Sequence, residues 1–320
     1  VIISYGKNMK NNYNSKKIQE DLQKKYFTLP IVHFECIEFG IENTNYLIKA
    51  DGKKFVLRVY NPSRKRNRIQ KEIEVMNYLL DNNIPVPKAI SSLNQNIIEK
   101  IDGKQAVLFS FIQGINPPWE PMNLELAKDI GMNVGKLQLV LLQSKIKVSS
   151  LSEFSASIRP KHSSFQNYLE EINQALEQID LKKLRKGLIH SDITRENIKV
   201  NNRSLMGFLD FDDLHKDYLS WDLAIALTHL FVAKSFGIDW KGLYSFLEGY
   251  QSVMKLNKQE KHALIPFIML RNINLLALIE KKSKQDTSKA LVSIKDSLLK
   301  KIKLIQTNKR RLAEAFSESF

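Results

Sequence analysis

The first third of the chain follows the apolar pattern of β-strands. Five runs rich in β-branched and aromatic residues are bounded by turn-forming residues; these runs are 31–39, 44–50, 54–60, 96–101 and 105–112. The turns at 51–52 and 102–103 both read Asp-Gly, and this order of runs and turns predicts an antiparallel sheet. Between the third and fourth runs, apolar residues recur at helical spacing from Ile69 to Leu80 and predict a helix that ends before Pro85.

The pattern changes after residue 112. Segment 113–118 contains glycine, asparagine and two prolines and predicts a linker. Stripes of apolar residues then predict five helices, over 124–141, 165–184, 219–234, 240–254 and 258–281, with one strand pair at 198–200 and 205–209. We therefore predict an α+β fold in three parts. These are an N-terminal extension (1–30) with a helix near 16–26, a sheet-containing lobe (31–112) and a mostly helical lobe (113–320).

The net charge of the chain does not alter the predicted fold. The formal net charge is +15, and the segment 281–311 holds eleven lysines and arginines against two aspartates, a balance of +9. Apolar residues from Leu291 to Ile305 recur at helical spacing within that segment. The lysines therefore read as the solvated face of a C-terminal helix, and we expect no nucleic-acid partner.

Several features favour a cytoplasmic protein. The longest uninterrupted apolar run, Ala263–Leu270, has eight residues, whereas a membrane helix needs about 20, so no membrane partner is expected. The first ten residues lack the order of a secretory signal, and the lone Cys36 can form no internal disulfide and no CxxC zinc site. P-loop, GxGxxG and GxSxG motifs do not occur, which disfavours P-loop ATPases, Rossmann dehydrogenases and serine hydrolases.

The informative stretch is an HxDxxxxN pattern over His190–Asn197, followed by Asp210 at a strand end 18 residues after Asp192. It resembles the catalytic core of kinases. The chain looks most like the aminoglycoside phosphotransferase and choline kinase superfamily; segments 42–46, 111–114, 190–197 and 219–227 are most similar to its homoserine kinase type. This resemblance covers about residues 31–280. It implies a bilobal protein-kinase-like fold and a kinase that uses ATP and Mg²⁺.

Phosphoryl transfer needs a hydroxyl oriented in line with phosphorus and a metal that neutralises the added charge. Asp192 would accept the proton of the hydroxyl as the catalytic base. Asn197 and Asp210 would give Mg²⁺ the oxygen ligands it prefers. His190 would pack the loop against the Asp210 segment. Asp222, at the start of an apolar helix, reads as an N-terminal cap, and the resemblance implies that it also ties down the loop.

Two charged residues of the first lobe are expected to bind the nucleotide. Strand alternation places Arg58 on the same sheet face as Val56, where many kinases carry a phosphate-binding lysine. At about 100° per residue, Glu72 lies near the apolar stripe of the following helix and Glu74 on its opposite side, so Glu72 is the predicted partner of Arg58.

Two backbone segments complete the predicted nucleotide site. The turn formed by Gly40 and residues 42–45 would cover the phosphates, and residues 109–112 would meet the adenine. The resulting candidate contacts are Asn43, Thr44, Ser110 and Ile112.

The acceptor is expected to be small, because only 12 residues separate Asp210 from Asp222 and no APE tripeptide follows. Arg271 lies on an otherwise apolar helix, so it either forms a structural ion pair or binds a substrate carboxylate. Asp213 and Asp217 would suit an amine, and Asp212 and Asp213 read equally well as solvated acids or aids to a second metal. An amino acid, an amino alcohol or an aminoglycoside remains open, with a homoserine-like acceptor favoured. The alternatives are a Ser/Thr protein kinase of the same superfamily and a non-catalytic kinase-fold binding protein.

Overall fold

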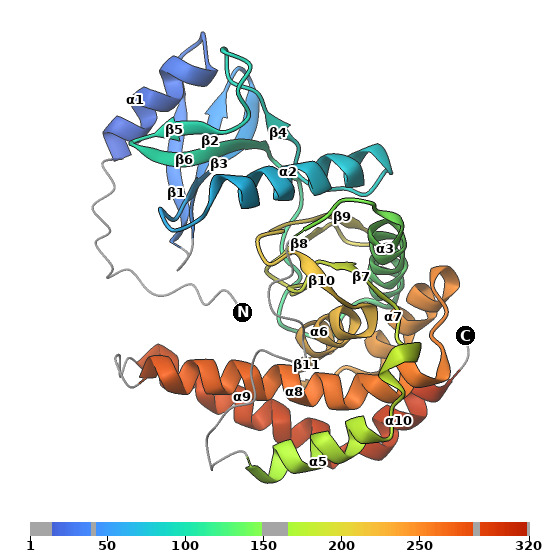
Figure 1. Cartoon of the computed structure of the whole chain (residues 1–320). Coiled ribbons are helices and arrows are strands. Elements are labelled where there is room, and N and C mark those ends of the chain that lie inside the picture. The colour runs from blue at the N-terminus through green and yellow to red at the C-terminus, as the bar shows by residue number, and fades with distance from the viewer. Residues whose placement is uncertain (1–14, 40–42, 149–165, 284–288, 319–320) are drawn as a thin grey trace. The chain divides into compact units, whose positions relative to one another are not determined.

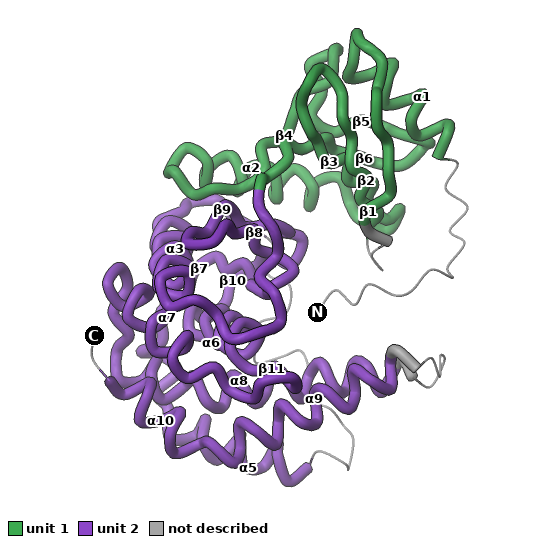
Figure 2. Tube along the Cα trace, turned by 180° about the vertical axis from the view of Figure 1, so that it is seen from behind, with its two compact units in different colours: residues 1–113 green, residues 114–320 purple. Residues whose placement is uncertain are grey.

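The computed structural model describes residues 15–39, 43–148, 166–283 and 289–318. The chain divides into two compact units, residues 1–113 and 114–320 (Figure 2). The boundary falls in the segment whose composition predicts a linker.

Unit 1 is built on a six-stranded antiparallel sheet with the order β1-β2-β3-β6-β4, in which β5 pairs with β6 (Figure 1). The strands are β1 (His33–Phe39), β2 (Asn43–Ala50), β3 (Lys53–Tyr60), β4 (Ala89–Ile90), β5 (Glu99–Ile101) and β6 (Lys104–Ser110). All five predicted runs form strands, although the fourth run is a strand only in its last three residues. The two-residue β4 was not predicted.

Two helices belong to this unit, α1 (Ser15–Tyr26) and α2 (Arg66–Asp81). The apolar face of α1 is part of the sheet core, where Ile18 and Leu22 are fully buried beside Tyr46 and Leu57. The helix expected in the N-terminal extension is therefore an integral part of unit 1. Helix α2 follows the predicted stripe and buries Ile69 together with the carboxylate-bearing Glu72.

Unit 2 is mostly helical (Figure 1). Its helices are α3 (Leu124–Gln143), α5 (Gln166–Glu177), α6 (Leu219–Phe231), α7 (Trp240–Val253), α8 (Lys258–Ser283), α9 (Lys289–Thr307) and α10 (Lys309–Ser317). Its strands form three antiparallel pairs: β7 (Lys186–Ile189) with β10 (His215–Tyr218), β8 (Ile198–Val200) with β9 (Leu205–Phe208), and β11 (Val232–Ala233) with β12 (Gly237–Ile238). Strand β10 was not predicted, and the helix expected over 165–184 is shorter, because a 3-10 turn at Leu181–Lys183 follows it.

Helices α3 and α7 cross at glycine. A Cβ added to Gly131 would lie 2.0 Å from the carbonyl oxygen of Phe246, and one added to Gly249 would lie 2.0 Å from that of Lys128. Since real Cβ atoms never approach so closely, any larger residue would force these two helices apart. This crossing fixes the position of α3. Gln138 of α3 hydrogen-bonds Asp222, which supports the loop 190–197 described below.

Helices α6 and α8 form the interior of unit 2. Every residue of α6 is buried, and α8 packs against α6 and α9. Among the described helices, α8 is long and apolar enough over Lys258–Lys281 to cross a membrane by length and composition, and 67% of its most apolar stretch is buried inside the protein. Core helices of soluble proteins also have this composition. The uninterrupted apolar run ends at Leu270, because the next two residues of α8 are the polar Arg271 and Asn272.

Candidate active site

The predicted catalytic loop, residues 190–197, connects β7 to β8 and is shaped around the ring of His190. The backbone N–H of Asp192 donates to His190 Nδ1 at 3.3 Å, and Nε2 therefore carries the proton that it donates to the carbonyl of Leu209 at 2.9 Å. The ring also packs on Phe211 with 4.5 Å between centroids. The predicted role of His190, holding the loop against the Asp210 segment, is confirmed.

The Asp192 carboxylate is buried and receives a hydrogen bond at each oxygen. Asn197 Nδ2 donates to its Oδ2 at 2.8 Å, and Arg271 Nη2 donates to its Oδ1 at 2.9 Å. Burial, the largest influence, raises the pKa of Asp192, whereas the positive charge of Arg271 lowers it and favours the carboxylate. The carboxylate is therefore positioned and charged, as a base requires.

Arg271 thus forms an ion pair, one of the two alternatives that the sequence left open. Its partner is Asp192, 79 residues away in the sequence. The pair is largely buried, with 17% of the arginine side chain and 10% of the aspartate side chain exposed. Arg271 therefore supports the catalytic candidate directly, a link that the sequence did not indicate.

Asn197 and Asp210 flank the same end of the β8–β9 hairpin. The backbone N–H of Leu209 donates to the carbonyl of Asn197 at 2.8 Å, which ties the residue preceding Asp210 to Asn197. The Asn197 amide nitrogen is used on Asp192, with a second bond to the Asp192 carbonyl at 3.0 Å, so the amide oxygen is the atom left to ligate a cation. Asp210 has a φ of 64°, a left-handed conformation that is strained for a residue with a side chain.

These two oxygen donors fit a magnesium site that phosphate oxygens complete. Within the described parts of the chain, no group of three or more His, Cys, Asp and Glu side chains could hold a metal. A divalent ion at the hairpin end would therefore share its coordination with a bound ligand, as a nucleotide-borne magnesium does.

Asp222 braces the loop from α6. Its Oδ1 accepts from the backbone N–H of Ser191 at 2.7 Å, and its Oδ2 accepts from the N–H of His190 at 3.4 Å and from Gln138 Nε2 at 3.3 Å. Burial raises the pKa of this carboxyl. The predicted N-terminal cap is wrong, because α6 begins at Leu219 after the cap residue Tyr218. The tie to the catalytic loop, which the resemblance implied, is confirmed.

The other acidic candidates lie in different surroundings. Asp212 is buried and Asp213 is exposed. Asp217 is buried in β10, where its Oδ1 accepts from the N–H of Tyr218 and its Oδ2 lies 3.5 Å from Nε2 of His215. Asp217 is therefore held within the protein, a poor position for the amine contact expected of it.

In unit 1 the predicted pair between Arg58 and Glu72 is confirmed. Arg58 Nη1 lies 3.3 Å from Glu72 Oε1, and Arg58 Nε donates to Asn45 Oδ1 at 3.3 Å. Tyr60 donates to the second oxygen of Glu72 at 3.2 Å. Glu74, which the helical angle directs outward, pairs instead with Lys71 on the surface. The carboxylate of Glu72 thus fixes the guanidinium of Arg58.

The structure describes some, but not all, of the other residues predicted to bind the nucleotide. Thr44 is buried and Asn43 half-buried at the start of β2, while Gly40 and Glu42 lie outside the described residues. The N–H of Ser110 donates to the carbonyl of Lys88 at 2.8 Å. This N–H is not available to an adenine. The contact predicted at Ile112, which follows β6, stays a prediction.

Comparison with known proteins decides the family. The sequence model of the phosphotransferase enzyme family, APH, matches residues 33–253, more than half of the chain. The chain belongs to the phosphotransferase enzyme family. It is a small-molecule kinase, and the resemblance read from its catalytic motifs is confirmed.

Among the relatives of this APH kinase are two homoserine kinases. That of Zymomonas mobilis subsp. mobilis is 27% identical over 261 residues, which cover 78% of this chain and 80% of the relative. That of Methylobacillus flagellatus is 25% identical over 253 residues, covering 76% and 77%.

Solved structures confirm the kinase-like fold. Amicoumacin kinase hAmiN, in complex with AMP-PNP, Ca²⁺ and Ami, has a TM-score of 0.73 at 20% identity, covering 93% of this chain and 95% of its own. The microcompartment-associated aminopropanol kinase has a TM-score of 0.71 at 17% identity, covering 92% and 98%. Because these names cover different acceptors, the fold alone does not specify the substrate.

Two supports of the APH catalytic loop escaped the sequence analysis. Asn116, read as a linker residue, has its Nδ2 within 2.7 to 3.0 Å of the carbonyl oxygens of Arg195, Glu196 and Ile198, which share its two amide hydrogens. The linker is held there because Ile115 pairs with Val200, and a Cβ on Gly114, whose φ is 113°, would lie 2.6 Å from the Val200 carbonyl oxygen. Nothing in the spacing of the sequence indicates these contacts.

Arg195 is the second support. It is 1% exposed and donates to the carbonyls of Leu230 and Glu120, with its guanidinium 5.3 Å from the Trp119 ring. Burial lowers the pKa of Arg195 to about 10. This side chain fastens the catalytic loop to the end of α6.

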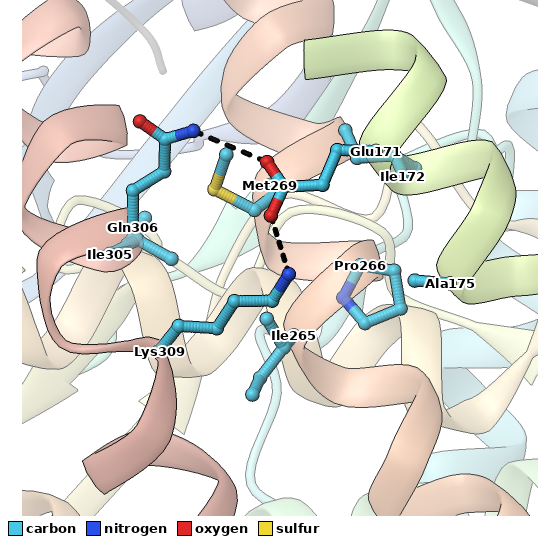
Figure 3. A pocket seen from close by; sticks show the side chains of 9 residues that line it. All are labelled: Glu171, Ile172, Ala175, Ile265, Pro266, Met269, Ile305, Gln306 and Lys309. Carbon is cyan, nitrogen blue, oxygen red and sulfur yellow. Dashed lines mark hydrogen bonds and ion pairs between the residues drawn. The ribbon is translucent and has the colours of Figure 1, made fainter. Parts of the chain in front are cut away.

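A pocket on another side of α8 is separate from this site (Figure 3). It is lined by Glu171, Ile172, Ala175, Ile265, Pro266, Met269, Ile305, Gln306 and Lys309. Glu171 accepts from Gln306 and Lys309 at its rim. Met269 and Arg271 are two residues apart, so at about 100° per residue they point to opposite faces of α8. The pocket therefore lies away from Asp192.

Proposed function

We propose that this small-molecule kinase transfers the γ-phosphate of ATP to the hydroxyl of a small amino acid, with a homoserine-like acceptor favoured. The observation that carries the proposal is the joint arrangement of Asp192, Asn197 and Asp210 at one end of the β8–β9 hairpin. The homoserine kinase names among the relatives support the amino acid acceptor. The nucleotide complex of amicoumacin kinase supports ATP and a divalent ion.

In this proposal the chain's own groups orient and deprotonate the acceptor. Asp192 accepts the hydroxyl proton, while Asn197 and Arg271 keep its carboxylate in one orientation. The Asn197 amide oxygen and the Asp210 carboxylate hold Mg²⁺, which when bound neutralises charge on the transferred phosphoryl group. Asp222, His190 and Asn116 keep the loop in the shape that this geometry requires.

The proposed role of unit 1 is nucleotide binding. Arg58 binds phosphate oxygens, and Glu72 fixes its guanidinium. An arginine offers a planar fork of donors where a lysine would offer a point charge. Such a reaction uses ATP and a small metabolite, which agrees with the proposed cytoplasmic location.

ADP release in the presence of Mg²⁺ and ATP tests the proposal directly. The acceptors are L-homoserine, 3-aminopropan-1-ol, ethanolamine, choline and an aminoglycoside, and Asp192→Asn is the control for contaminating kinases. We expect acceptor-dependent turnover that is fastest with homoserine and is lost in the control. Turnover only with the aminoglycoside or choline would overturn the amino acid acceptor, and phosphorylation of added protein alone would favour the protein kinase alternative.

A further inference from the structure

One face of α8 carries two polar side chains, and one of them contacts the proposed catalytic base. Arg271 and Asn274 are three residues apart, so they are neighbours on the same face of the helix. Arg271 reaches Asp192 through Nη2 at 2.9 Å. Asn272 points elsewhere, because its amide donates to Thr228 of α6 at 3.0 Å.

Two atoms on this face are buried without a hydrogen-bond partner among the described residues, Arg271 Nε and Asn274 Oδ1. Unpaired buried polar atoms are uncommon in proteins, and each costs about 1–3 kcal/mol. As whole residues Arg271 and Asn274 are partly exposed, in contrast to the fully buried Asn272. They therefore lie at the edge of the packed interior, where a ligand can supply the missing partners.

The two atoms differ in chemistry. Arg271 Nε is a positively charged donor, whose natural partner is a carboxylate. Asn274 Oδ1 is an acceptor, whose natural partner is an ammonium group. A donor for an anion and an acceptor for a cation, one helical turn apart, match the two charged groups of an α-amino acid.

We propose that Arg271 Nε and Asn274 Oδ1 form the subsite that binds the carboxylate and the ammonium of the acceptor. This inference rests on the proposed phosphotransfer at Asp192. Because one guanidinium contacts both the base and the carboxylate, the acceptor's hydroxyl and carboxylate lie only a few bonds apart. The class of acceptor is a short hydroxy amino acid, and Asn274 is the residue that selects its amine.

The test uses Asn274, because an Arg271 variant would also disturb Asp192. Asn274→Leu removes the acceptor atom at similar volume, and Asn274→Asp keeps an oxygen at that place. Lys281→Gln, an exposed change on the same helix, is the matched control. Each variant is assayed with L-homoserine, with 3-aminopropan-1-ol, which lacks the carboxylate, and with 4-hydroxybutanoate, which lacks the ammonium.

We expect Asn274→Leu to raise the KM for homoserine about tenfold or more, with the KM for ATP unchanged. The melting temperature should be the same or higher, because the substitution removes an unpaired buried oxygen. Asn274→Asp should keep that KM within a few fold of wild type. The KM for 4-hydroxybutanoate, measured in the wild type and in Asn274→Leu, should be equal, because this compound has no ammonium to lose. Lys281→Gln should match the wild type throughout.

A wild-type KM for homoserine in Asn274→Leu would overturn the subsite while leaving the proposed kinase activity intact. An equal rise of the KM values for homoserine and 4-hydroxybutanoate in Asn274→Leu would overturn the subsite as well, because the effect would not come from the ammonium. Failure of the wild type to phosphorylate any acceptor would instead overturn the proposed function.

Discussion

Each unit of the molecule contains a largely buried arginine–carboxylate pair. In one pair the carboxylate supports the arginine, and in the other the arginine supports the carboxylate. In unit 1, Glu72 is 3% exposed and fixes Arg58, whose guanidinium is the proposed phosphate ligand. In unit 2, Arg271 fixes Asp192, whose carboxylate is the proposed base. The same interaction therefore positions a cation in one unit and an anion in the other. Losing the supporting partner should impair nucleotide binding in the first case and chemistry in the second.

The largest expected effect comes from the anion of unit 2. Asp192→Asn should lower turnover about 10²-fold or more, because an amide cannot accept the hydroxyl proton. ATP affinity should remain close to wild type. Turnover by ADP release and nucleotide affinity by calorimetry are measured on the same preparation, and unchanged turnover would contradict the assignment of Asp192.

The metal ligand comes next. In the wild type, Mg²⁺ should tighten ATP binding, and Asp210→Ala should remove most of that gain, since it deletes the anionic ligand at the hairpin end. Calorimetric titration with ATP, with and without Mg²⁺, measures the effect. Glu177→Ala, a change at an exposed acid elsewhere in unit 2, is the control and should retain the gain. A full magnesium effect in Asp210→Ala would place the ligands elsewhere.

A smaller effect is expected from the supporting carboxylate of unit 1. Glu72→Gln should raise the KM for ATP by roughly three- to tenfold with little change in the acceptor KM, because Arg58 loses its charged partner but keeps Asn45. Glu74→Gln, two residues along the same helix and paired only with the surface Lys71, provides the control. Equal effects of the two substitutions would show that Glu72 contributes only its general charge.

The last prediction concerns stability rather than activity, at a buried cation whose hydrogen bond is to a backbone carbonyl rather than to a carboxylate. Lys301 is 6% exposed, its Nζ lies 3.5 Å from the Thr228 carbonyl, and burial lowers its pKa to about 8. Because the unfolded chain binds this proton up to about pH 10.5, the folded state is penalised most below pH 8, and the penalty fades between pH 8 and pH 10.5. Lys301→Met should therefore stabilise the protein by about 2–3 kcal/mol at pH 7 and little at pH 10.5.

Chemical denaturation at both pH values measures this difference. A Lys300→Met variant, altered at an exposed neighbour, should show no such pH dependence. A gain that is equal at the two pH values would mean that Lys301→Met acts through packing alone.

The contrast between the two pairs also shows what sequence can predict. Arg58 and Glu72 are 14 residues apart on a strand and the helix that follows, so strand alternation and helical angle together predict their meeting. Asp192 and Arg271 lie on elements whose packing depends on the whole of unit 2. Asn116 and Asp222 reach the loop through contacts of the same kind, which explains why Asn116 was missed.

The secondary structure shows the same difference between features that the local sequence predicts and features that depend on tertiary packing. Strands and helices with a clear period, such as β2, β3, α2 and α3, were predicted close to their observed bounds. Strand β4 has two residues and β10 has four, too few to show a period. Strand β10 exists because residues 215–218 pair with β7, and that partner is not encoded in the local sequence.

The most direct test of the account is a double-mutant cycle between Asp192 and Arg271, measured as kcat at saturating homoserine. The variants are Asp192→Asn, Arg271→Met and the double variant. If Arg271 promotes the chemical step by holding Asp192, and its contact with the acceptor carboxylate affects only KM, Arg271→Met should lower kcat by itself but should lower it no further in the Asp192→Asn background, within about twofold. Losses that multiply in the double variant, or a wild-type kcat in Arg271→Met, would contradict the account.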